Sequence, residues 1–196
     1  PARALQQLAE GNRAAVPQLQ DLARDSGAAP VLRATALAAI GRAGELPPTD
    51  ILLDLLHGPD PLLRMGAVRS LAGVPLARRY QILQPLITDS VTSVRLAVAE
   101  ALAEVPLDQL NEGAEPLRAL FAEYLTIQRQ HADMPGVQLQ LGLFLLNRGD
   151  LPAAERAYRE ALHLNPQLLP ARLNLADLLR GLQREDEARQ ELQAAL

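Results

Sequence analysis

The chain has 196 residues and a formal net charge of −4, and it contains 48% hydrophobic but only 3% aromatic residues. This composition favours helices over sheets, and the acidic balance provides no basic surface for nucleic acid. The chain has no Cys, which excludes disulfides, thiolate zinc sites and covalently attached haem within these residues. It also has no apolar stretch of about 18 residues, so no membrane insertion is expected.

The first half of the chain contains a repeat with a period of 31 residues. Arg33, Arg64 and Arg95 stand 31 positions apart, and two hydrophobic columns follow them. The columns are Ala36, Ala67 and Val98, and Ile40, Leu71 and Leu102. Because the two columns are four residues apart, they lie on one face of a helix. Three aligned helices with a common buried face are therefore expected.

A shorter apolar segment precedes each of these helices. The segments run over Val16 to Leu22, Ile51 to Leu56 and Ile82 to Ile87, and turn sequences such as Gly58 to Pro61 follow or separate them. Gly, Asp and Pro in such turns end one helix and begin the next. The predicted unit is a helix, a tight turn and a second helix. Since one pair cannot bury its apolar face alone, the pairs are expected to stack.

This pattern resembles the HEAT-repeat family, including the variant known from phycobilisome-lyase-type proteins. Asp60 to Ala67 looks like that family's turn and second-helix signature. The resemblance implies that an Asp six residues before the Arg pairs with it. Asp89 fits this for Arg95, whereas Gly58 and Gly27 stand at the equivalent earlier positions. We interpret the three arginines as structural, bonded to turn carbonyls and to partners such as Asp89, with anion binding as the alternative.

The C-terminal part has a period of 34 residues and resembles the tetratricopeptide repeat. Its small and large packing positions are Leu141, Gly142, Leu145, Gly149, Ala154, Tyr158, Ala161 and Pro166. The pattern returns 34 positions later at Leu175, Ala176, Leu179, Ala188, Leu192 and Ala195. Gly142 is expected to let two helices touch, and Pro166 to end the second one. The second copy stops at Leu196, so we interpret the chain as part of a longer protein.

The predicted fold class is all-α, an α-α superhelical solenoid in which HEAT-like repeats run into tetratricopeptide repeats. Residues 1–105 are assigned to the HEAT-like repeats, 106–133 to adapter helices and 134–196 to the tetratricopeptide repeats, the second one truncated. Residues 116–131 are expected to form one long helix, in which Tyr124 lies 34 positions before Tyr158. The three parts are predicted to form one continuous solenoid.

Tetratricopeptide proteins usually bind extended peptides in a concave groove lined by the first helix of each repeat. By position, the resemblance assigns this groove to Leu139, Leu143, Leu146, Asn147, Leu173, Asn174, Asp177 and Arg180. Chaperone-binding members carry Lys and Asn where Leu139 and Leu143 stand, so the resemblance implies an apolar stripe in place of a carboxylate clamp. The stripe either contacts another chain or is covered by the adapter helix or by further repeats.

No catalytic motif is present, and His57, His131 and His163 are too far apart in sequence for a helical metal pair. We therefore predict a non-catalytic scaffold without metal or cofactor that binds a protein or peptide, with a homodimer through residues 185–196 as a further expectation.

Two alternatives come from resemblance. The order of repeats, with the segment Gln128 to Pro135 between them, is similar to the C-terminal part of bacterial multi-haem cytochrome c proteins. That would make the chain an exported docking domain with haem sites upstream, in the periplasm; otherwise the cytoplasm is expected. The HEAT turn signature is also similar to that of bilin lyase subunits.

Overall fold

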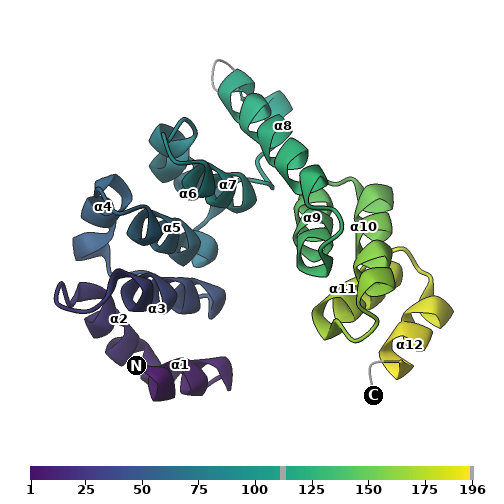
Figure 1. Ribbon diagram of the computed structural model, residues 1–196, viewed down its shortest axis with the longest axis horizontal. Coiled ribbons are helices and arrows are strands. Elements are labelled where there is room, and N and C mark those ends of the chain that lie inside the picture. Colours follow the sequence, from purple (N-terminus) through teal and green to yellow (C-terminus); the bar gives the residue numbers. More distant parts are fainter. Residues whose placement is uncertain (111–113, 195–196) are drawn as a thin grey trace. The chain divides into compact units, whose positions relative to one another are not determined.

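The computed structural model describes residues 1–110 and 114–194, and every regular element in these ranges is a helix (Figure 1). The predicted all-α class is thus confirmed. Contacts divide the chain into two compact units, Pro1–Leu120 and Phe121–Leu196, and the division falls inside helix α8 (Ala114–Gln130). The predicted boundaries at 105/106 and 133/134, and the continuity of the solenoid, stay predictions.

The first unit consists of short helices joined by tight turns. Its α-helices are α1 (Ala2–Ala9), α2 (Val16–Arg24), α3 (Pro30–Arg42), α4 (Thr49–His57), α5 (Pro61–Ser70), α6 (Leu76–Leu83) and α7 (Thr92–Ala101). Single 3₁₀ turns lie at Arg13–Ala15, Leu71–Gly73, Gln84–Leu86 and Leu107–Gln109. Helix α3 contacts α5, and α5 contacts α7, so the second helices of the three repeats form one row (Figure 1).

The two predicted hydrophobic columns form the core of this row. All six side chains, Ala36, Ala67, Val98, Ile40, Leu71 and Leu102, are completely buried. The helices begin where the turn sequences predict. Pro30 and Pro61 occupy the first positions of α3 and α5, and the Asp60 carboxylate accepts hydrogen bonds from the Leu62 and Leu63 amides.

The prediction for the third repeat was wrong in its first helix. The segment Ile82 to Ile87 was expected to form that helix, but α6 runs over Leu76–Leu83 and a 3₁₀ turn follows at Gln84–Leu86. Pro85 explains the difference, because its ring and its missing N–H prevent an α-helix from continuing through it. The apolar character of the segment comes from burial of Leu83, Leu86 and Ile87 across a helix end.

The second unit contains two further helix pairs. They are α9 (Pro135–Asn147) with α10 (Leu151–Leu164), and α11 (Leu169–Gly181) with α12 (Glu185–Gln193). Helix α9 contacts α10, α10 contacts α11 and α11 contacts α12. The C-terminal part of α8 packs here through aromatic rings. Tyr124 is stacked on Phe144 with ring centroids 4.3 Å apart, and Phe121 meets Phe144 edge to face at 5.4 Å.

Gly142 and Tyr158 form a close contact between α9 and α10. Tyr158 is completely buried, and a Cβ placed on Gly142 would lie 2.4 Å from its Cε1 atom. The ring therefore fills the space that a side chain at position 142 would need. The Tyr158 hydroxyl has no hydrogen-bond partner among the described residues, and burial raises its pKa to about 12.

We expect Tyr158→Phe to raise the free energy of unfolding by about 1 kcal/mol, because it removes an unpaired buried hydroxyl without losing a hydrogen bond. The difference should depend on pH. The unfolded chain releases the phenol proton near pH 10, whereas the folded protein holds it to about pH 12, so stability is lost as the pH rises through this window. Urea unfolding at pH 8 and pH 11 should show a larger advantage for Phe at pH 11. An equal advantage at both pH values would contradict the burial of this group.

Candidate partner-binding face of the second unit

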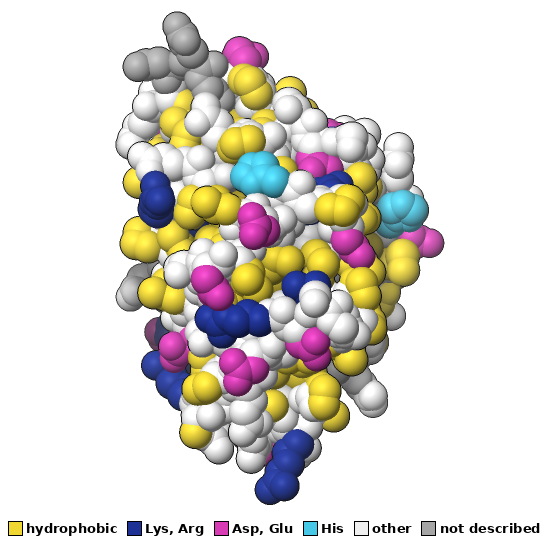
Figure 2. Space-filling model, turned by 90° about the vertical axis from the view of Figure 1, so that its left-hand side faces the viewer, with side chains coloured by type: hydrophobic (Ala, Val, Ile, Leu, Met, Phe, Trp, Pro, Cys, Tyr) yellow, Lys and Arg dark blue, Asp and Glu magenta, His cyan; other side chains and the backbone are white. Residues whose placement is uncertain are grey.

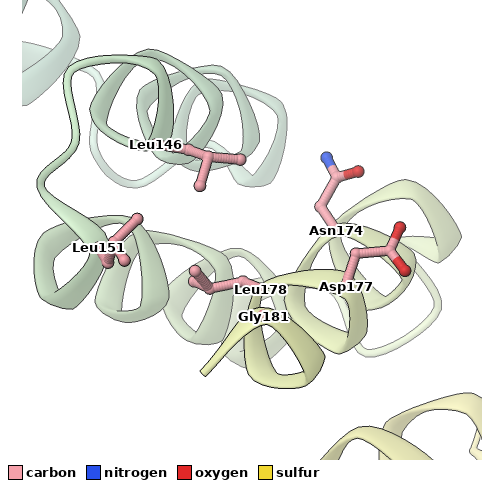
Figure 3. A pocket seen from close by; sticks show the side chains of 6 residues that line it. All are labelled: Leu146, Leu151, Asn174, Asp177, Leu178 and Gly181. Carbon is pink, nitrogen blue, oxygen red and sulfur yellow. The ribbon is translucent and has the colours of Figure 1, made fainter. Parts of the chain in front are cut away.

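The second unit contains a hollow of about 340 Å³ between its helices. Its lining consists of Leu146, Leu151, Asn174, Asp177, Leu178 and Gly181. The residues come from three helices, α9, α10 and α11. Figure 3 shows the three leucine side chains directed toward one space, with the Asn174 amide at its edge and the Asp177 carboxylate turned away from the leucines.

The polar side of the hollow is held in place by contacts on α11. Arg180 Nη1 donates to Asp177 Oδ1 at 3.0 Å, which occupies the carboxylate with a neighbour one turn away. No hydrogen bond joins the Asn174 side chain to another described residue. An amide offers both a donor and an acceptor, so Asn174 is available to the backbone of a bound segment. The hollow thus combines an apolar floor with one polar group at its rim.

The structure brings three of the eight predicted groove residues, Leu146, Asn174 and Asp177, into this one hollow. Leu139 and Leu143 lie elsewhere, partly buried against the core of the unit. The remaining three residues, Asn147, Leu173 and Arg180, are exposed and do not line the hollow. The stripe is therefore partly covered by the unit's own core and partly open.

The groove assigned from the tetratricopeptide resemblance did not include three residues that line the hollow, Leu151, Leu178 and Gly181. Leu151 is the first residue of α10, a helix that carries no groove residues in the resemblance. Leu178 and Gly181 lie on the same turns of α11 as predicted residues, one and four positions after Asp177. An added Cβ at Gly181 would meet no atom within 4 Å. The absence of a side chain at Gly181 helps to keep the hollow open.

A charge network holds α12 against α10. Arg184 Nη1 donates to Glu155 at 2.7 Å, and Arg184 Nε donates to Glu187 at 2.6 Å. Arg159 bonds both carboxylates from the other side. The Arg184 guanidinium holds the pKa of both carboxyl groups below their usual range. This network lies just beyond the turn at Gln183, which has a φ of 62° where the preceding repeat has Gly149 at 78°.

The remaining structural residues of this unit lie at helix ends. Helix α10 ends at Leu164, two residues before Pro166, and the Pro166 carbonyl accepts a hydrogen bond from Arg172 Nη2. The proposed dimer segment, as far as the structure describes it, consists of α12 (Glu185–Gln193) and Ala194. Residues 195 and 196, including Ala195 of the second repeat, lie outside the described residues.

The arginine column of the first unit is held differently from one repeat to the next. Arg64 Nη1 donates to the carbonyls of Gly58 and Pro59, and its Nη2 donates to Asp89 Oδ1 at 3.2 Å. Its Nε lies 3.0 Å from Asp89 Oδ2 but is not aligned for a hydrogen bond, so that contact is one of charge. Asp89 also accepts from Arg95 through its backbone carbonyl. The Asp89 carboxylate thus pairs with Arg64, the arginine of the preceding repeat.

In the described ranges, no group of three or more His, Asp or Glu side chains is arranged to hold a metal ion. None of the described helices combines the length and apolar character needed to cross a membrane.

Two families of repeats match the chain. Residues 49–132 match the family of HEAT repeats, and residues 145–196 match the tetratricopeptide repeat. No curated protein and no solved structure matches the chain significantly. Neither family match supports the resemblance to multi-haem cytochrome c proteins. The chain is therefore similar to HEAT repeats and then to tetratricopeptide repeats, two kinds of helical repeat that generally mediate protein–protein interaction.

Proposed function

We propose that the chain is a non-catalytic interaction module, and that its second unit binds an extended segment of a partner protein in the hollow between α9, α10 and α11. The observation that carries this proposal is the lining itself. Three leucines converge beside an exposed polar rim, which is the usual composition of a site that holds one apolar anchor and orients the peptide around it.

The chemistry of the lining supports binding in preference to catalysis. The only carboxylate in the hollow, Asp177, is paired with Arg180, and no nucleophile or base lies beside it among the lining residues. A reaction site would need such a convergent set. The families that the chain matches are typically non-catalytic scaffolds. No observation favours the cytochrome-associated docking role or the bilin lyase role over a general interaction module.

The size of the hollow suggests the anchor. A space of about 340 Å³ suits one large aliphatic or aromatic side chain with part of its backbone. The Asn174 amide can bond that backbone, as amide side chains at peptide-binding sites do. Peptides selected for binding should therefore share one large apolar residue without a required net charge.

The test begins with selection of a random peptide library on the purified protein. An enriched peptide is then labelled, and its affinity is measured by fluorescence anisotropy. We expect Gly181→Phe to weaken binding by about tenfold or more, because the ring enters the hollow and takes the place of the anchor. Gly181 has open space around its Cβ, so this substitution should leave the fold intact.

The matched control is Gly136→Phe. Gly136 lies in α9 of the same unit, also has open space around its Cβ and does not line the hollow. The Gly136→Phe variant should bind the peptide with the same affinity as the wild type. Failure of any peptide to enrich, or equal loss of affinity in both variants, would reject the proposed site.

A further inference from the structure

The internal repeat of the first unit provides a direct comparison between its arginines. Arg64 is buried, and both oxygens of Asp89 lie within 3.2 Å of its guanidinium. The position equivalent to Asp89 in the preceding repeat, 31 residues earlier, is Gly58. By this equivalence, Gly58 occupies the position from which a carboxylate would pair with Arg33. The chain therefore lacks at Arg33 the partner that it supplies at Arg64.

The contacts of Arg33 agree with this comparison. Its Nε donates to the Ala23 carbonyl at 2.9 Å, and this is the only hydrogen bond or ion pair of its side chain within the described part of the chain. Its Nη atoms thus have no protein partner in those residues. A guanidinium offers five N–H donors, and a half-buried one gains most from a bidentate carboxylate.

Arg33 borders a hollow of about 280 Å³. The other lining residues are Ile51, Asp54, Leu55, Gly58, Pro59, Asp60 and Leu63. Three of them, Ile51, Leu55 and Leu63, are aliphatic and form an apolar wall in the hollow that Arg33 borders. A ligand that fits must present a carboxylate and a neighbouring apolar group together.

The two acidic residues of the hollow limit the charge of that ligand. Asp60 is engaged as the cap of α5 through the Leu62 and Leu63 amides, and Asp54 is exposed on α4. Neither forms an ion pair with Arg33 within 4 Å. Both repel negative charge on the ligand, so a ligand with one negative charge is favoured over a ligand with two. Figure 2, which views the molecule from the side of α4, shows acidic and basic side chains intermixed, so no extended basic field compensates.

We propose that the hollow at Arg33 binds the C-terminal carboxylate of a polypeptide that ends in an aliphatic residue. Such a terminus carries one negative charge and an apolar side chain on the same Cα atom, which matches a guanidinium beside an aliphatic wall. An Asp or Glu side chain would bring the charge without the apolar group. The carboxylate would take on Arg33 the place that Asp89 takes on Arg64. This site lies in the first unit and stands independently of the function proposed for the second.

The test uses two matched probes, N-acetyl-leucine and N-acetyl-leucinamide, which differ only in the carboxylate. Binding is followed by NMR of the Ile51 and Leu55 methyl groups. We expect saturable shifts with the acid and none with the amide at the same concentrations. Arg33→Gln should abolish the shifts, whereas Arg42→Gln, an exposed arginine of the same helix, should retain them. Equal binding of both probes, no binding of the acid, or binding that survives Arg33→Gln would overturn the proposal.

A second pair of variants supplies the carboxylate from the chain. Gly58→Asp should block the acid probe by occupying Arg33, whereas Gly58→Asn should not. A Cβ at position 58 would lie 2.9 Å from the Asp54 carbonyl oxygen, and both variants share this strain, so their difference reports the charge. Asp54→Asn should tighten binding by about twofold, since it removes an exposed like charge. Unchanged binding in Gly58→Asp would also overturn the assignment to Arg33.

Discussion

Replacing Gly142 with Ala is expected to lower the free energy of unfolding of the second unit by about 2–3 kcal/mol. Ala is the better helix former by about 1 kcal/mol, so the sign of the effect separates packing from propensity. The new Cβ would lie 2.4 Å from Cε1 and 2.5 Å from Cδ1 of Tyr158. Because that ring is completely buried, it cannot move into solvent. Urea unfolding followed by far-UV circular dichroism measures the change.

The control for Gly142 is the same substitution at Gly181, where an added Cβ meets no atom. Gly181→Ala should stabilise by about 0.5 kcal/mol. The next repeat also suggests a compensating change, since it has Ala176 where Gly142 stands and Leu192 where Tyr158 stands. Both of these residues belong to the core packing of the unit. The double variant Gly142→Ala with Tyr158→Leu should therefore recover part of the loss, and an additive loss would contradict this explanation.

Replacing Arg64 with Ala is expected to lower the free energy of unfolding of the first unit by about 3–5 kcal/mol. The substitution leaves the Asp89 carboxylate, whose side chain is 8% exposed, without its cation. It also leaves the Gly58 and Pro59 carbonyls without the donor that they share. Thermal or urea unfolding of the full chain, with fluorescence of a probe attached in the first unit, measures the effect.

Arg33→Ala is the matched control, because Arg33 occupies the same repeat position but its side chain makes one hydrogen bond. It should cost about 1 kcal/mol. If both substitutions lowered the free energy of unfolding equally, the ion pair with Asp89 would contribute no stability beyond a single hydrogen bond. If Arg64→Ala left stability unchanged and removed partner binding, the arginine column would be a binding site and the structural interpretation would be wrong.

The repeat architecture could be predicted from sequence because helix packing imposes a strict period. Ala36, Ala67 and Val98 had to be small or apolar at every 31st residue for α3, α5 and α7 to stack, and all three are fully buried. The first helix of the third repeat could not be placed correctly from hydrophobicity alone. Its buried residues continue past Pro85, and burial does not distinguish a helix from the turn that follows it.

Contacts between repeats were harder to predict than contacts within one. The spacing of Asp89 and Arg95 pointed to a partner six residues away, whereas the Asp89 carboxylate meets Arg64 of the preceding repeat. A spacing rule reports sequence distance, and the rise from one helix pair to the next brings residues 25 apart into contact. The lining of the hollow in the second unit was difficult to predict for the same reason. Leu151 contributes to it from α10, whereas the predicted residues lie on α9 and α11.

The most direct test of the proposed interaction module is a methyl NMR titration of the protein with an enriched peptide whose C-terminus is amidated, so that it carries no terminal carboxylate for the hollow at Arg33. We predict that the methyl groups of Leu146, Leu151 and Leu178 shift together and saturate at one peptide per chain, while exposed Leu53 in the first unit does not shift. Saturable shifts confined to the first unit, or no shift at these three leucines, would contradict the assignment of the binding site to the hollow between α9, α10 and α11.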